Sequence, residues 1–199
     1  MSNQVTPCRG KEMTTRLTVF GGLQPVWPLL CLCIVGLVLA GCQGIPEGAE
    51  PVSGFELQRY TGKWYEIARM DHPFERGLSN VTAEYSLRED GGVRVLNRGY
   101  EASKGEWKEA EGKAYFVDDE STGQLKVSFF GPFYASYNVV ALDKQAYQWA
   151  LVVGPDTDYM WILSRQPELD RAIIDELLAM ARSYGFKTDE LIFVDQDKR

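Results

Sequence analysis

The chain has 199 residues, of which 45% are hydrophobic and 25% charged, a composition typical of a globular protein with one domain core. Acidic residues outnumber basic residues 28 to 21, and the net charge of −7 argues against a nucleic-acid-binding protein. His72 is the single histidine, which excludes sites that need several imidazoles, such as a three-histidine zinc site.

The N-terminal region has the pattern of a secretion signal. Arg9, Lys11 and Arg16 precede an uncharged apolar run over residues 29–40. This run is too short to span a bilayer comfortably, and it is typical of the apolar core of a signal peptide. We therefore predict a signal peptide over residues 1–41. Either Met1 or Met13 could be the start, because Arg16 supplies a positive charge in both cases.

The tetrad Leu39-Ala40-Gly41-Cys42 follows the apolar run directly. It resembles the bacterial lipobox, in which the cysteine thiol takes a diacylglyceryl group and the amine freed by cleavage is acylated. Cys42 is the predicted lipidation site, and two or more acyl chains anchor a protein stably where one does not. The resemblance also implies the outer membrane, since Gln43 stands where an aspartate favours inner-membrane retention. The alternative is a plain secretory signal with a coincidental cysteine.

The other three cysteines, Cys8, Cys31 and Cys33, also lie before residue 42. The body of the protein therefore has no disulfide, thiolate metal site or cysteine nucleophile. Residues 42–54 are rich in glycine and proline and poor in apolar side chains, so we predict a lipidated tether there. The remaining residues, 55–199, are predicted to form a single domain.

Short extended segments separated by turn signals make up most of this domain. Asp90-Gly91-Gly92 and Gly154-Pro155-Asp156 are examples of the turn signals. The eight predicted strands cover residues 64–70, 81–87, 93–100, 107–117, 124–130, 134–142, 149–153 and 159–164. Regular spacing and short connections indicate an all-β antiparallel meander, either a barrel or a sandwich. An up-and-down meander of eight strands closes most naturally as a barrel, because closure removes both exposed edges.

One helix follows the strands. Pro167 suits a position near the helix start, Glu168 and Asp170 suit the first turn, and Gly185 is a candidate C-cap. Leu169, Ile173, Leu177, Met180 and Tyr184 recur at helical spacing on one face. We expect this C-terminal α-helix to pack on the outside of the barrel. A short final strand is predicted within residues 191–196.

Two motifs at the ends of this pattern resemble signatures of the lipocalin family. Residues 62–69, GKWYEIAR, resemble the first signature, and residues 161–165, WILSR, resemble the third. The resemblance implies a lipocalin barrel in which Gly62, Trp64 and Arg165 form a structural signature. Arg165 is then expected to lie over the Trp64 ring as a cation–π pair. The second signature is only partly present, because residues 142–144 keep just its aspartate, Asp143.

Further segments resemble bacterial outer-membrane members of the family, namely residues 71–78, 126–134, 137–143 and 154–156. This resemblance implies an outer-membrane-anchored protein whose domain faces the periplasm. It also implies a fatty acid, phospholipid or lysophospholipid ligand, held for lipid storage or transport in envelope maintenance, and a possible homodimer. A fatty-acid-binding protein would be the rival small barrel, but that class lacks the C-terminal helix and the secretion signal.

Strand alternation and the family resemblance together suggest the ligand-binding residues. An eight-stranded barrel has room for one small ligand, and an acyl chain requires an aromatic and aliphatic lining with a few hydroxyls. The predicted ligand-binding side chains are Tyr85, Phe129, Tyr134, Ser136, Asn138 and Trp161. Trp161 should face the interior if its neighbours Met160 and Ile162 face the helix. The alternative is an envelope structural or interaction lipoprotein whose barrel is filled by its own side chains.

Catalysis finds little support in the sequence. His72 beside Asp71 is the only candidate base for a serine hydrolase, but the chain has no Gly-x-Ser-x-Gly motif. We interpret His72 as a loop residue near the barrel mouth. We interpret Glu66 and Glu84 as solvated strand residues. The prediction is a binding protein that is not an enzyme and has no cofactor or metal.

Overall fold

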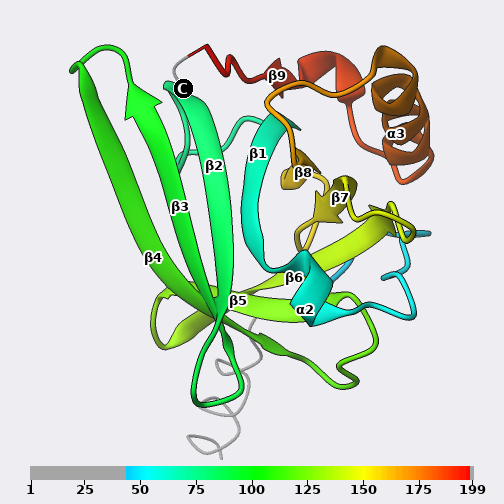
Figure 1. Cartoon of the computed structure of the whole chain (residues 1–199). Coiled ribbons are helices and arrows are strands. Elements are labelled where there is room, and N and C mark those ends of the chain that lie inside the picture. Colours follow the sequence, from blue (N-terminus) through cyan, green and yellow to red (C-terminus); the bar gives the residue numbers. More distant parts are fainter. Residues whose placement is uncertain (1–43, 198–199) are drawn as a thin grey trace, which may run out of the picture. The chain divides into compact units, whose positions relative to one another are not determined.

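The computed structural model describes residues 44–197. The predicted signal peptide, its start and Cys42 lie outside the described residues. Figure 1 shows the elements. The strands are β1 Gly62–Arg69, β2 Leu78–Leu87, β3 Val93–Glu101, β4 Glu106–Phe116, β5 Gln124–Phe130, β6 Phe133–Leu142, β7 Trp149–Val153, β8 Met160–Ser164 and β9 Ile192–Phe193. The helices are α2 Leu57–Tyr60, α3 Arg171–Ser183 and the short 3-10 helix Thr188–Glu190.

The strands form one closed antiparallel sheet. Their order is β2-β3-β4-β5-β6-β7-β8-β1-β9, and β2 also pairs with β1, so the meander returns to its own start. One part of β1, Gly62–Tyr65, pairs with β2, while Ala68 and Arg69 pair with β9. The predicted eight-stranded up-and-down barrel with a C-terminal helix and an extra strand is confirmed. Among residues 44–197, no helix is both long and apolar enough to cross a membrane.

The C-terminal helix α3 begins later than predicted. It starts at Arg171, because the Asp170 carboxylate accepts a hydrogen bond from the backbone N–H of Ala172 and caps the helix there. Pro167 therefore precedes the helix. At the other end the prediction holds, since Gly185 has a φ of +88° just after the C-cap residue.

Two apolar cores lie on opposite sides of the sheet. One fills the barrel, and the other lies between the barrel and α3, where Leu177 packs with Met160 and Ile162 of β8. Successive side chains of a strand point to opposite faces. Trp161 and Leu163 therefore face the interior, as predicted, and Figure 1 shows α3 beside the β7–β8 side of the barrel.

The segment over residues 44–54 packs along the barrel and is not a loose tether. Ala49 is buried with the core under α3. The backbone N–H of Val52 donates to the carbonyl of Val139, and the carbonyl of Val52 accepts from Gly123. The composition of the segment favoured a linker, but its backbone groups find partners in β6 and at the residue just before β5.

Candidate functional site

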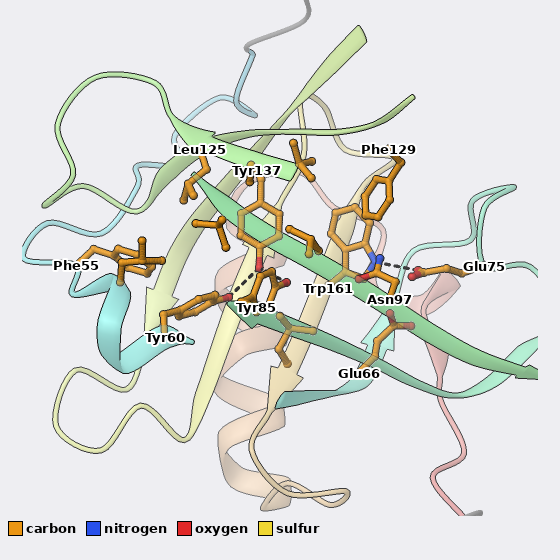
Figure 2. Close-up of a pocket in the computed structure, with 16 residues that line it drawn as sticks. Phe55, Tyr60, Glu66, Glu75, Tyr85, Asn97, Leu125, Phe129, Tyr137 and Trp161 are labelled. Carbon is orange, nitrogen blue, oxygen red and sulfur yellow. Dashed lines mark hydrogen bonds between the residues drawn. The ribbon is translucent and has the colours of Figure 1, made fainter. Parts of the chain in front are cut away.

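The interior of the barrel holds a cavity of about 90 Å³. Figure 2 shows its lining, which is mainly apolar and aromatic. The lining residues are Phe55, Leu57, Tyr60, Glu66, Glu75, Tyr85, Val93, Val95, Asn97, Ala114, Leu125, Val127, Phe129, Tyr137, Trp161 and Leu163. A long acyl chain therefore requires lining side chains to move.

Three tyrosine hydroxyls form a chain inside the cavity. The Tyr137 hydroxyl lies 2.8 Å from the Tyr60 hydroxyl and 2.8 Å from the Tyr85 hydroxyl, as the dashed lines in Figure 2 show. Burial raises the pKa of each of these phenols above its ordinary value. All three groups are therefore neutral hydroxyls at physiological pH, and they add polarity without charge to an apolar lining.

A second polar group lies at another part of the cavity. Glu66, Glu75, Asn97 and Trp161 gather there, and the Trp161 indole N–H donates to Glu75 Oε2 over 3.1 Å (Figure 2). Our interpretation of Glu66 as solvated is wrong, because this side chain is only 3% exposed. It stands two residues after Trp64 on β1, and this spacing places both side chains on the interior face.

Two basic side chains lie behind these carboxyls. Arg69, 1% exposed, donates through Nη1 to Glu66 Oε1 over 2.7 Å and through Nη2 to the backbone carbonyl of Glu75 over 2.8 Å. His72 Nε2 lies 2.9 Å from Glu75 Oε2. His72 is in the β1–β2 loop, as predicted, but it is buried, with ring contacts to Phe74 and Trp161.

The two carboxyls differ in pKa. Burial raises the pKa of Glu66 well above its ordinary value, and the nearby Glu75 carboxylate adds to the effect against the opposing charge of Arg69. Burial also acts to raise the pKa of Glu75, but His72, the Trp161 N–H and Arg69 outweigh it, so the pKa is lowered. Glu75 is therefore the carboxylate of the pair, and Glu66 takes up a proton far more readily.

Of the six predicted ligand-binding side chains, Tyr85, Phe129 and Trp161 line the cavity. The prediction that Tyr134, Ser136 and Asn138 face the interior is wrong. The Ser136 hydroxyl donates to the backbone carbonyl of Gly44 over 2.7 Å, on the outer face of β6.

Asn138 lies on the same outer face and donates to the carbonyl of Val153 over 3.4 Å. The Tyr134 ring packs there against Tyr115. Each of the two faces of β6 carries both polar and apolar side chains, so alternation alone did not determine which face points into the barrel. Tyr137, which sequence reasoning missed, lines the cavity instead. The apolar Val139 on the same face was the available signal.

The lipocalin signature residues meet at the end of the barrel covered by α2. The Arg165 guanidinium carbon lies 3.9 Å from the centre of a Trp64 ring, so the predicted cation–π pair is present. The same guanidinium donates to the backbone carbonyls of Lys63, Arg59 and Tyr147, at 2.9, 2.7 and 3.3 Å. Gly62 has a φ of +89°, and a β-carbon there would lie 3.4 Å from Arg165 Nη1.

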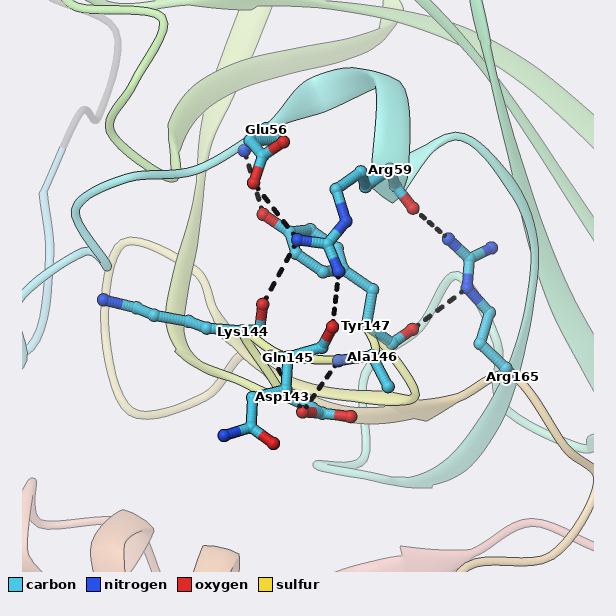
Figure 3. Close-up of polar contacts among 8 residues, drawn as sticks. All are labelled: Glu56, Arg59, Asp143, Lys144, Gln145, Ala146, Tyr147 and Arg165. Carbon is cyan, nitrogen blue, oxygen red and sulfur yellow. Dashed lines mark hydrogen bonds and ion pairs between the residues drawn. The ribbon is translucent and has the colours of Figure 1, made fainter.

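Figure 3 shows how the β6–β7 turn is fastened to α2 at this end. Arg59 donates to the carbonyls of Lys144 and Gln145, and its guanidinium lies 4.2 Å from the centre of the Tyr147 ring. The Asp143 carboxylate accepts from backbone N–H groups of the turn. The retained aspartate of the second signature thus shapes the turn that seals the barrel.

Family comparison identifies a lipocalin-like domain over residues 55–196. The chain is 60% identical over 167 residues to the outer membrane lipoprotein Blc of Vibrio cholerae, covering 84% of this chain and 96% of the relative. It is 50% identical over 171 residues to Blc of Escherichia coli strain K12, covering 85% and 96%. The chain is an outer-membrane lipoprotein like these relatives.

Solved structures agree on the fold. Insecticyanin from the tobacco hornworm Manduca sexta superposes with a TM-score of 0.60 at 20% identity, covering 76% of this chain and 86% of that one. No group of three or more His, Cys, Asp or Glu side chains within residues 44–197 is placed to hold a metal ion. The closed barrel, the Trp64–Arg165 pair and the sequence matches lead to one conclusion: the chain belongs to the lipocalin family.

Proposed function

We propose that this protein binds the acyl chain of a fatty acid, phospholipid or lysophospholipid inside its barrel, and that it stores or moves lipid for maintenance of the cell envelope. The observation that carries the proposal is the barrel cavity, whose lining is apolar and aromatic with polar side chains in two places. Tyr85, Phe129 and Trp161 are the proposed contacts. A binding role without catalysis fits the family.

The energetics support an acyl ligand. Burial of a 16-carbon chain contributes about 13 kcal/mol at ~0.8 kcal/mol per methylene. Association costs of roughly 4–15 kcal/mol oppose this gain. At the lowest of these costs the surplus is about 9 kcal/mol, which corresponds to a dissociation constant just below 1 μM.

The small volume of the cavity favours a second candidate function. A barrel mostly filled by its own side chains fits an envelope structural or interaction lipoprotein.

Native mass spectrometry of the purified full-length protein separates the two candidates. A co-purified lipid, or a mass shift on adding palmitate or a lysophospholipid, supports the carrier. Absence of both, together with an unchanged far-upfield methyl NMR spectrum on lipid addition, rejects it. The mass of the intact protein in the native mass spectrum also tests the possible homodimer.

Trp161 offers a direct test of the pocket. Trp161→Ala removes aromatic contacts along the proposed acyl path and takes one hydrogen-bond donor away from the Glu75 carboxylate. We expect binding of long-chain lipids to weaken by ~1–3 kcal/mol. Titration of a fluorescent fatty acid measures this, with Trp161→Phe as the matched control that keeps a ring. Equal affinities in wild type and Trp161→Ala would place the lipid elsewhere.

The anchor is proposed at Cys42, outside the described residues. Cys42→Ser should leave the precursor uncleaved or without acyl chains, because the diacylglyceryl group is carried on the thiol. Metabolic labelling with a palmitate analogue checks this, and Cys33→Ser is the control that should still be labelled. A labelled Cys42→Ser variant would contradict the assignment.

A further inference from the structure

The charged side chains that line the cavity all have the same sign. Glu66 and Glu75 are the only carboxylic acids in the lining, the three tyrosines there are neutral, and no Lys, Arg or His belongs to it among the described residues. An anionic headgroup placed in this part of the cavity therefore meets carboxyls and no facing cation. Opposed carboxylates in a buried site repel strongly, because the low effective dielectric screens them little.

The basic side chains of the cluster, Arg69 and His72, do not change this picture, because they lie behind the acids. Arg69 holds Glu66 Oε1 and the Glu75 backbone carbonyl, and His72 lies on Glu75 Oε2. Both basic residues are 3% exposed or less. The carboxyls of Glu66 and Glu75 therefore face the cavity, while the basic side chains of Arg69 and His72 are turned away from it.

A hydrogen-bond acceptor beside the two carboxyls also lacks a donor. The side-chain oxygen of Asn97 is buried and has no hydrogen-bond partner among the described residues. The Trp161 N–H, in contrast, is already committed to Glu75. Figure 2 shows Glu66, Glu75 and Asn97 grouped around Trp161. A buried acceptor without a donor costs free energy that a ligand N–H or O–H would recover.

We propose that this group of Glu66, Glu75 and Asn97 selects the lipid headgroup: it takes a neutral or cationic headgroup that donates hydrogen bonds, a hydroxyl or an ammonium, in preference to the carboxylate of a free fatty acid. The inference rests on the proposed function and adds the chemistry of the headgroup to it. The acyl chain then extends from this place along Tyr85 and Tyr137 toward Phe55 and Leu125.

Three ligands with the same 11-carbon alkyl chain test the inference, since chain burial cancels among them. Undecylamine, undecanol and laurate are titrated against N-phenyl-1-naphthylamine bound to the wild-type protein at pH 7.5, at concentrations where each ligand is dissolved as a monomer. We expect the amine and the alcohol each to bind at least tenfold more tightly than laurate. A ratio below tenfold for either overturns the headgroup inference while the lipid-binding function stands. Failure of all three ligands and the dye to bind overturns the proposed function itself.

Variants locate the selectivity. Glu66→Gln replaces a carboxyl by an amide that can donate to an anion, and it should reduce the amine-to-laurate affinity ratio at least fivefold. Asn97→Leu leaves the Arg69–Glu66 ion pair in place and should weaken binding of the alcohol and the amine threefold or more, with laurate binding unchanged. It also keeps the test decisive if Glu66→Gln fails to fold. Tyr134→Phe, on the outer face, is the matched control that should change none of the affinities. Wild-type ratios in both Glu66→Gln and Asn97→Leu would overturn the assignment.

Discussion

The two ends of the barrel each contain a buried or half-buried arginine, but the partners differ. At the α2 end, Arg165 lies on the Trp64 ring and donates to three backbone carbonyls, all neutral groups. At the end with the β1–β2 loop, Arg69 donates to the carboxyl of Glu66 and to the backbone of the loop. Removal of Arg165 leaves only neutral groups behind, whereas removal of Arg69 leaves a buried carboxyl without its positively charged partner. The α2 end is therefore suited to sealing and the opposite end to recognition.

The largest effect should come from Arg69→Met. The change removes the cation behind Glu66 and Glu75 and breaks hydrogen bonds that hold the β1–β2 loop. Loss of one partner of a buried ion pair costs about 3–5 kcal/mol. Urea unfolding at neutral pH measures the free energy of unfolding. Arg76→Met, in the same loop, is the control: its pair with Asp71 is exposed to solvent, so its loss should lower the free energy of unfolding far less. Equal losses in the two variants would contradict the contrast between buried and exposed pairs.

A smaller loss is expected for Arg165→Ala at the α2 end. The variant loses the stacking on Trp64 and the hydrogen bonds to backbone carbonyls, which together correspond to about 2–3 kcal/mol. Lipid affinity should hardly change, because Arg165 does not line the cavity. Thermal unfolding and a lipid titration check both statements. Arg165→Lys should be intermediate, since it keeps the charge but not the planar guanidinium. An unchanged melting temperature in Arg165→Ala would remove the sealing role.

The smallest effect should be a pH dependence carried by Glu66. Its pKa is raised in the folded protein, so its contribution to stability is full below the unfolded-state pKa of about 4.3 and is lost as pH rises through the folded-state value. Glu66→Gln has no such titration. The wild type should therefore lose stability relative to Glu66→Gln as the pH rises above about 4.3. Parallel stability profiles of the two proteins from pH 4 to pH 9 would show that Glu66 has the same pKa in the folded and the unfolded state.

Particular strands show how far sequence reasoning reached. In β8, Met160 and Ile162 share one apolar face, and this pattern correctly predicted that Trp161 faces the interior. In β6 the same reasoning chose the wrong face, because Tyr134, Ser136 and Asn138 alternate with Ala135, Tyr137 and Val139. Alternation gives the period of a strand, but the inward face must be identified from side chains that differ clearly in polarity.

Glu66 shows a related difference. A lone glutamate on a strand normally belongs to the solvent face, since burial of an unpaired carboxylate is costly. Its burial here depends on Arg69, three residues away, and on Glu75 from the β1–β2 loop. The packed segment over residues 44–54 also depends on distant partners, the backbone groups of Gly123 and Val139.

The sequence by itself determined the antiparallel meander, the outer helix and the Trp64–Arg165 pair, because these follow from local periodicity, turn residues and two short motifs. Tertiary structure alone decided the inward face of β6, the buried carboxyl cluster and the position of the N-terminal segment. The physical reason is that a polar group can be buried only where a partner from elsewhere in the chain meets it. Which partner it meets is fixed when the barrel closes.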